Sequence, residues 1–200
     1  MKVSVIIPYK TDRGWLQEAI DSVPKEAELI ISRGNGNCQK NFNNGIRKAS
    51  GDIIRWLHED DRLTENSIQD TIETFEQQDC DFIHGCAYQV HMGGHGRRIP
   101  FIPKKQYPTL QEMLKYNRLH GGTLAFSREV FDKIGYFDQS LIWAEEYEFT
   151  LRCLYNQLKL GYCNTFLYEY RVHENQKSNA DHGVRQKYIT ENIRSKYANY

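Results

Sequence analysis

The chain has 200 residues, enough for one domain with a buried core, and its 26 acidic and 26 basic side chains cancel. This balance gives no global attraction to nucleic acid or to an anionic membrane, so we predict neither as a partner. No apolar run approaches the roughly 20 residues of a membrane span, and no signal-peptide pattern precedes the first strand. Five cysteines without a CxxC pair favour reduced thiols in a cytoplasmic protein over disulfides or a zinc site.

The first third of the chain alternates short apolar runs with helical patterns. The predicted elements are a strand at 3–8, a helix with its apolar stripe at 15–23, a strand at 28–31, a helix at 42–49 and a strand at 53–57. Thr11 or Asp12 can cap the first of these helices. Strands that alternate with helices in this way are typically parallel and joined by right-handed crossovers.

The rest of the chain predicts a less regular series. We expect a helix capped by Thr64 over 68–75, a strand at 81–90 and a glycine-rich mobile loop at 92–98. A helix should then run from a Thr109/Glu112 capping box to Tyr116, followed by a strand at 121–126. The last three elements are a helix capped by Ser127 and ended by Gly135, a helix with its apolar stripe at 147–158, and a strand at 165–172. The tail from Gly183 predicts a basic, weakly amphipathic helix.

Two acidic stretches are candidates for chemistry. The strand at 53–57 is followed by Glu59, Asp60 and Asp61, and ligands of open α/β sheets bind at the carboxyl ends of strands. Adjacent carboxylates repel, and a divalent cation is their usual partner; the alternative is a solvated acidic turn. Glu145 and Glu146 fall in the first turn of a predicted helix, where the macrodipole alone favours acids.

Taken in order, these segments resemble family 2 glycosyltransferases, which have the GT-A fold and use nucleotide sugars. The resemblance covers nearly the whole chain. The motifs that carry it are Val3-Ser4-Val5-Ile6-Ile7-Pro8-Tyr9, Asn43-Asn44-Gly45-Ile46, Leu57-His58-Glu59-Asp60-Asp61, Arg128-Glu129-Val130-Phe131 with Gly135-Tyr136-Phe137-Asp138, Ala144-Glu145-Glu146-Tyr147, and Tyr170-Arg171-Val172-His173.

The resemblance implies an α/β GT-A fold, with a Rossmann-like mixed, mostly parallel sheet flanked by helices. It implies one catalytic domain at 1–181, with a nucleotide-sugar-binding half at 1–90 and an acceptor half at 91–181, before a C-terminal helix at 182–200. The implied reaction is inverting transfer of a sugar from a nucleoside-diphosphate sugar, by default a UDP-sugar, to a hydroxyl of a glycan or other acceptor. The implied cofactor is Mn²⁺ or Mg²⁺, which stabilises the charge on the leaving diphosphate.

The resemblance also assigns roles to residues. Asp61 is expected to hold the metal, Asp60 to share it or contact the ribose, and His173 to complete the metal shell. Glu146 is expected to be the general base that deprotonates the acceptor hydroxyl, with Glu145 supporting the loop or an acceptor hydroxyl. The residues expected to bind the nucleotide sugar are Pro8, Tyr9, Ser32, Arg33, Asn43 and Asp60.

Three positions depart from the family pattern. Ser32-Arg33-Gly34 stands where the family has Asp-Asp-Gly, which leaves the nucleobase open. His58 replaces the first Asp of the acidic run, and Glu146 replaces the expected catalytic Asp. Two alternatives therefore stay in view: a catalytically weak nucleotide- or glycan-binding relative, and a sugar nucleotidyltransferase. The second expects a glycine-rich phosphate loop after the first strand, where residues 8–14 contain one glycine.

Overall fold

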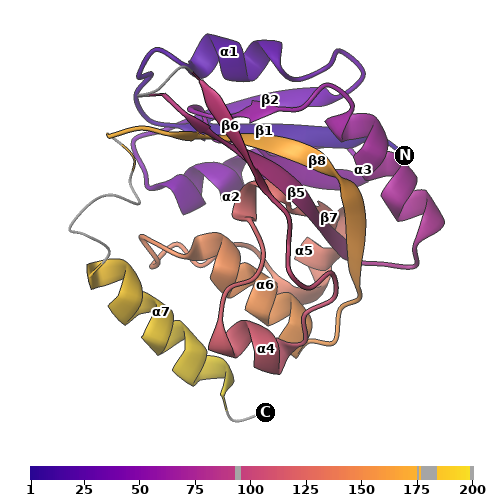
Figure 1. Ribbon diagram of the computed structural model, residues 1–200, viewed down its shortest axis with the longest axis vertical. Coiled ribbons are helices and arrows are strands. Elements are labelled where there is room, and N and C mark those ends of the chain that lie inside the picture. Colours follow the sequence, from indigo (N-terminus) through magenta and orange to yellow (C-terminus); the bar gives the residue numbers. More distant parts are fainter. Residues whose placement is uncertain (93–95, 175, 177–183, 199–200) are drawn as a thin grey trace.

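The computed structural model describes residues 1–92, 96–174, 176 and 184–198, without the side chains of 184–186. Its centre is an eight-stranded sheet in the order β2-β1-β3-β7-β5-β8-β4, with β6 paired to β5 (Figure 1). The strands are β1 (Val3–Tyr9), β2 (Glu28–Arg33), β3 (Ile53–Trp56), β4 (Arg62–Leu63), β5 (Phe82–His91), β6 (Arg97–Phe101), β7 (Ala125–Ser127) and β8 (Leu160–Val172).

The sheet is mixed, which confirms the predicted fold class. The β2-β1-β3 unit is parallel, as the strand–helix alternation predicted, and β5 pairs in parallel with β8. The pairs β3–β7, β4–β8, β5–β6 and β5–β7 are antiparallel, so the parallel share is smaller than expected. The strand β6 corrects the predicted loop at 92–98, because Arg97 and Arg98 pair with β5; residues 93–95 lie outside the described residues.

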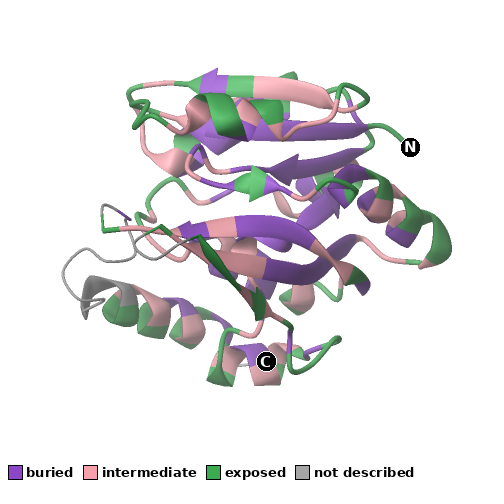
Figure 2. Cartoon of the chain, turned by 45° about the horizontal axis from the view of Figure 1, so that its top comes forward, coloured by how far each residue is buried: buried purple, intermediate pink, exposed green. Residues whose placement is uncertain are grey.

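Helices cover both faces of the sheet. They are α1 (Leu16–Asp21), α2 (Cys38–Lys48), α3 (Ser67–Gln77), α4 (Leu110–Lys115), α5 (Arg128–Ile134), α6 (Glu145–Tyr155) and α7 (Val184–Tyr197), with a 3₁₀ turn η1 (Gly121–Thr123). Successive side chains of a strand point to opposite faces, so Val5 and Ile7 pack with α1 and α3 while Ile6 packs with α2, α5 and α6. Both buried layers are continuous between sheet and helices (Figure 2).

The residues at the N-termini of the helices can be compared with the caps that the sequence predicts. The capping box of Thr109 and Glu112 is confirmed at α4. At α1, Asp12 is the residue that accepts from the backbone N–H of Gly14 and Leu16. Thr64 was wrong as a cap, because its hydroxyl donates to the Phe166 carbonyl of β8 and α3 begins only at Ser67. Ser127 precedes α5 without a side-chain cap bond.

Two boundaries differ from the sequence prediction for tertiary reasons. A strand was predicted at 121–126, but residues 121–123 form η1 and β7 begins at Ala125. A buried arginine contacts this turn. Arg55 of β3 donates from Nη1 to the Ser67 hydroxyl at 2.6 Å and from Nη2 to the Gly122 carbonyl at 3.5 Å. Burial lowers the pKa of Arg55 to about 10. The helix α6 ends at Tyr155 because Gln157 takes a left-handed conformation, with φ of 59°, before β8 begins.

The C-terminal helix α7 packs against α6. Ile193 and Tyr197 are buried, and the Tyr197 hydroxyl donates to Glu148 Oε1 at 2.5 Å. Arg194 Nε donates to the Tyr147 hydroxyl at 3.2 Å. The predicted boundary between 181 and 182 lies outside the described residues. Each of the five cysteines is described and is a free thiol. In the described part of the chain, no helix combines the length and apolar character that a membrane crossing requires.

Candidate functional site

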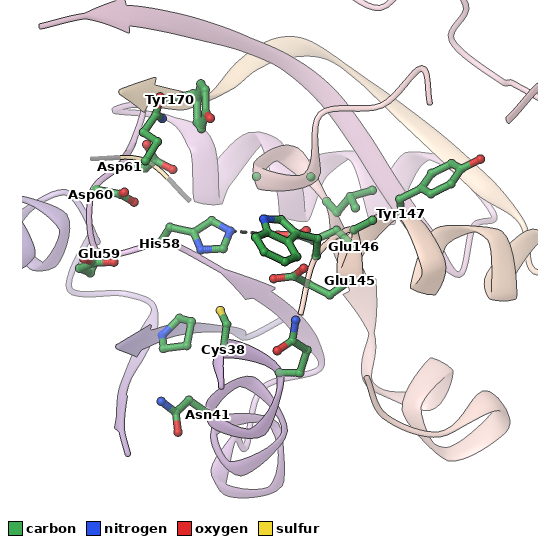
Figure 3. Close-up of a pocket in the computed structure, with 18 of the residues that line it drawn as sticks. Cys38, Asn41, His58, Glu59, Asp60, Asp61, Glu145, Glu146, Tyr147 and Tyr170 are labelled. Carbon is green, nitrogen blue, oxygen red and sulfur yellow. Dashed lines mark hydrogen bonds and ion pairs between the residues drawn. The ribbon is translucent and has the colours of Figure 1, made fainter. Parts of the chain in front are cut away.

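A cavity of about 920 Å³ lies between the carboxyl ends of β1 and β3 and the N-terminal turn of α6. Figure 3 shows the acids after β3 on one side of this space and those of α6 on the other. Six of the predicted site residues line it: Pro8, Tyr9, Asp60, Asp61, Glu145 and Glu146. Residues that are far apart in the sequence therefore meet at the sheet edge where ligands of open α/β folds bind.

Three of the residues predicted to bind the nucleotide sugar are placed elsewhere. The Ser32 side chain is buried and its hydroxyl donates to the Asn41 carbonyl. Asn43 is buried too, and its carboxamide pairs with both backbone groups of Phe137, which ties α2 to the loop after α5. Arg33 is exposed, with its guanidinium 5.8 Å from the Tyr9 ring centroid. The polar atoms of Ser32 and Asn43 form hydrogen bonds within the fold, and their contact with a nucleotide sugar stays a prediction.

Asp60 lines the cavity, and His173, which is not among the lining residues, lies beside Asp60. His173 Nε2 is 3.2 Å from Asp60 Oδ2, although 113 residues separate them in the sequence. The His173 ring packs on Trp15, with centroids 4.4 Å apart. Arg13 reaches the same acids, donating to Glu59 at 2.6 Å and to Asp60 at 2.9 Å. The acidic run is thus a paired, partly buried group and not a solvated turn.

Asp61 has a different environment from Asp60. It is 1% exposed, and its two oxygens accept from the Tyr168 hydroxyl and the Arg171 backbone N–H, both at 2.8 Å. Burial and the nearby charge of Asp60 raise the pKa of Asp61 to about 7. Tyr168 also accepts from the backbone N–H of His58 at 3.1 Å. This network fastens the end of β3 to β8.

The acids of α6 meet His58 across the cavity. Glu145 is buried and Glu146 partly buried in the first turn, which follows Ala144 in a left-handed conformation with φ of 59°. His58 Nε2 lies 3.0 Å from Glu146 Oε1, and the Cys38 thiol lies beside the same imidazole. Burial acts to lower the pKa of His58, but these two contacts outweigh it and raise that pKa well above its usual value. The contact between His58 and Glu146 therefore connects the end of β3 to the first turn of α6.

Several lining residues were missed by sequence reasoning. Arg13 and Cys38 carry no local signal for the site, and Tyr168 is one of thirteen tyrosines. Gln39, in the first turn of α2, lines the cavity with its side chain fully buried, and neither of its amide atoms has a hydrogen-bond partner among the described residues. Buried polar atoms without partners are rare and costly, so a bound molecule is a natural partner for this carboxamide.

The mixed sheet, the helices on both faces and the acids at the end of β3 define the GT-A class of α/β fold. Comparison with solved structures agrees: Staphylococcus aureus TarS 1–349 in complex with UDP-GlcNAc matches with a TM-score of 0.70 at 17% identity, over 91% of this chain and 62% of that one. The same protein with UDP matches with a TM-score of 0.67 at 18% identity, over 100% of this chain and 71% of that one.

Sequence comparison then places the chain within that class. The family model "Glycosyl transferase family 2" matches residues 16–135, so the chain belongs to glycosyl transferase family 2. An uncharacterized glycosyltransferase of Rickettsia typhi is 26% identical over 88% of this chain, which spans 66% of that relative. An uncharacterized glycosyltransferase of Bacillus subtilis, YwdF, is 24% identical over 96% of this chain, which spans 69% of that relative. Glu145, Glu146 and His173 lie beyond the matched segment.

Proposed function

We propose that this protein transfers a sugar from a nucleoside-diphosphate sugar, by default a UDP-sugar, to a hydroxyl of a glycan or another acceptor, with inversion at the anomeric carbon. The observation that carries the proposal is the shared cavity, which has Asp60 on the β3 side and Glu146 on the α6 side. The UDP and UDP-GlcNAc complexes of TarS support a uridine nucleotide as the first donor to test.

Glu146 is the general base in this proposal. Its carboxylate takes the proton of the acceptor hydroxyl as that oxygen attacks the anomeric carbon. The bond between the anomeric carbon and the diphosphate oxygen breaks, and the nucleoside diphosphate leaves with the electron pair. A single displacement of this kind inverts the configuration at the anomeric carbon. Glu145, buried beside the base, supports the turn or an acceptor hydroxyl.

The residues present fit a divalent cation that is shared with the substrate. Among the described residues no three His, Cys, Asp or Glu side chains are grouped as a metal site. Asp60 Oδ2 and His173 Nε2 are nevertheless neighbours, and Mg²⁺ or Mn²⁺ takes its remaining positions from phosphate oxygens and water. Asp60 and His173 would hold the cation, which when bound stabilises charge on the leaving diphosphate. Both Asp61 oxygens are already engaged, whereas Arg13 and His173 both contact one oxygen of Asp60, Oδ2, so Asp60 is the better candidate for the first carboxylate ligand.

A thermal-shift panel tests the donor and the metal together. UDP, GDP, CDP, ADP and TDP are each added with MnCl₂, MgCl₂ or EDTA, and a specific ligand raises Tm by mass action. We expect the largest rise with UDP and Mn²⁺, lost in EDTA and in Asp60→Asn. Release of UDP from UDP-GlcNAc then tests catalysis. Glu146→Gln should keep the Tm shift and lose turnover, while Glu129→Gln, an exposed acid in the first turn of α5, serves as control.

A binding-only function is the second candidate, because His58 already engages one oxygen of the proposed base. The same measurements separate the two. Nucleotide-dependent Tm shifts without release of UDP would support the binding function. Full turnover in Glu146→Gln would remove Glu146 from its role, and absence of any nucleotide-dependent shift would refute both candidates.

A further inference from the structure

Two of the departures from the family pattern touch one another. His58 stands in place of an aspartate after β3, and Glu146 stands in place of an aspartate in α6, 88 residues further along the chain. In the structure His58 Nε2 and Glu146 Oε1 are 3.0 Å apart, and Figure 3 shows the ring directed across the cavity at the α6 acids. An aspartate at position 58 would place a second negative charge beside the glutamate. The two substitutions are therefore chemically matched.

The His58 ring is itself held by its surroundings. The backbone N–H of His58 donates to the Tyr168 hydroxyl at 3.1 Å. The Cys38 thiol, in the first turn of α2, lies beside the imidazole. The Phe42 ring meets the imidazole edge-on, with centroids 5.7 Å apart. The imidazole therefore has two neighbours on α2, Cys38 and Phe42, and the backbone of His58 is tied to β8, so these contacts limit the positions that the ring can take.

Glu146 needs such a contact more than an aspartate would. Its side chain has one more rotatable bond, so its carboxylate samples more positions. The stem is already restricted, because a Cβ built on Gly121 would lie 3.2 Å from Cβ, Cγ and Cδ of Glu146. This packing guides the chain as far as Cδ and leaves the carboxylate orientation to polar contacts. The hydrogen bond from His58 supplies one of these at a well-defined point.

We propose that His58 is a positioning residue, which orients the carboxylate of Glu146 toward the acceptor hydroxyl and compensates for the extra methylene of the glutamate. This inference rests on the proposed function. Misplacement of a reacting group by about 1 Å can cost on the order of 10²-fold in rate. The same contact is not needed for binding the donor, so its loss should appear in kcat rather than in the donor KM.

The test measures kcat and the donor KM for release of UDP. The assay uses the nucleotide sugar and the metal ion with which the wild-type protein shows turnover. His58→Leu removes the hydrogen-bond donor and should lower kcat by about 10²-fold, with donor KM within about twofold. His58→Gln keeps an N–H donor and should recover much of that loss. Glu146→Gln should leave only residual turnover, and adding His58→Leu should not decrease this residual rate further, because residues that act as a unit are not additive. Glu129→Gln is the surface control.

The outcomes separate this inference from the function on which it rests. Wild-type kcat in His58→Leu, or an equal loss in His58→Leu and His58→Gln, would overturn the positioning role while leaving the transferase proposal in place. So would a fully additive loss in the double variant. If wild type releases no nucleotide from any donor, the proposed function fails, and the positioning role fails with it. A change in donor KM without a change in kcat would assign His58 to donor binding and refute the inference.

Discussion

Replacement of Asp61 by asparagine should stabilise the ligand-free protein at pH 8. The carboxylate is 1% exposed and its oxygens accept from Tyr168 and from the backbone of Arg171. Burial raises the pKa of Asp61 from 3.8 to about 7. Since the folded pKa lies above the unfolded value, the native state binds more protons between these limits, and wild type loses stability as pH rises from about 4 to 7. Asparagine carries no such cost.

The size of the effect follows from the shift. A difference of about three pKa units corresponds to about 4 kcal/mol between the neutral and charged forms. Asparagine keeps an acceptor for the Arg171 N–H, but its amide cannot accept from the Tyr168 hydroxyl, and a lost buried hydrogen bond costs about 1–3 kcal/mol. We therefore expect Asp61→Asn to be about 1–3 kcal/mol more stable than wild type at pH 8 and less stable than wild type at pH 4.

The assay is urea unfolding in EDTA at pH 4 and pH 8, followed by tryptophan fluorescence. Asp132→Asn, at an exposed position of α5, is the matched control and should leave both values unchanged. A destabilised Asp61→Asn at pH 8, or a difference from wild type that is the same at both pH values, would show that burial of this carboxylate is not costly. The Mn²⁺-dependent UDP shift, measured on the same variant, then asks whether Asp61 is needed for the metal.

Two further predictions concern stability. Gly122→Ala should lower the free energy of unfolding by about 1–3 kcal/mol, because the new Cβ would lie 2.4 Å from the Tyr168 ring; wild-type urea stability in this variant would contradict the packing. Burial lowers the pKa of His84 to about 4. The unfolded state then binds more protons below about pH 6.5, so His84 should cost about 3 kcal/mol as pH falls from 6.5 to 4. His84→Phe should lose this component of the pH dependence, and an unchanged pH profile would refute it.

The sequence predicted the half of the fold in which local pattern and topology agree. Apolar runs separated by helical stripes led directly to the parallel β2-β1-β3 unit. Motif order placed Asp60 and Glu146 in one site although 86 positions separate their numbers in the sequence. The strands β4 and β6 were missed because one has two residues and the other contains Pro100 and no alternating pattern.

The finer roles depended on contacts that no local pattern encodes. Asp60 and Asp61 are adjacent and chemically identical, yet one lies beside His173 and the other is bound by Tyr168. Only the pairing of β8 with its neighbours places Tyr168 there. Ser32 and Asn43 occupy family positions, but their hydrogen bonds go to the backbone. The position of a residue in a motif therefore does not encode the hydrogen-bond partner of its side chain, which depends on its neighbours in the fold.

The attachment of α7 to α6 connects the C-terminal helix to the helix that carries the proposed base. Two residues of α7 donate hydrogen bonds to the residues that directly follow the proposed base. Arg194 donates to Tyr147, and Tyr197 donates to Glu148. The helix α7 thus stabilises the first turn of α6. A fusion partner attached after α7 could therefore disturb the turn that carries Glu145 and Glu146.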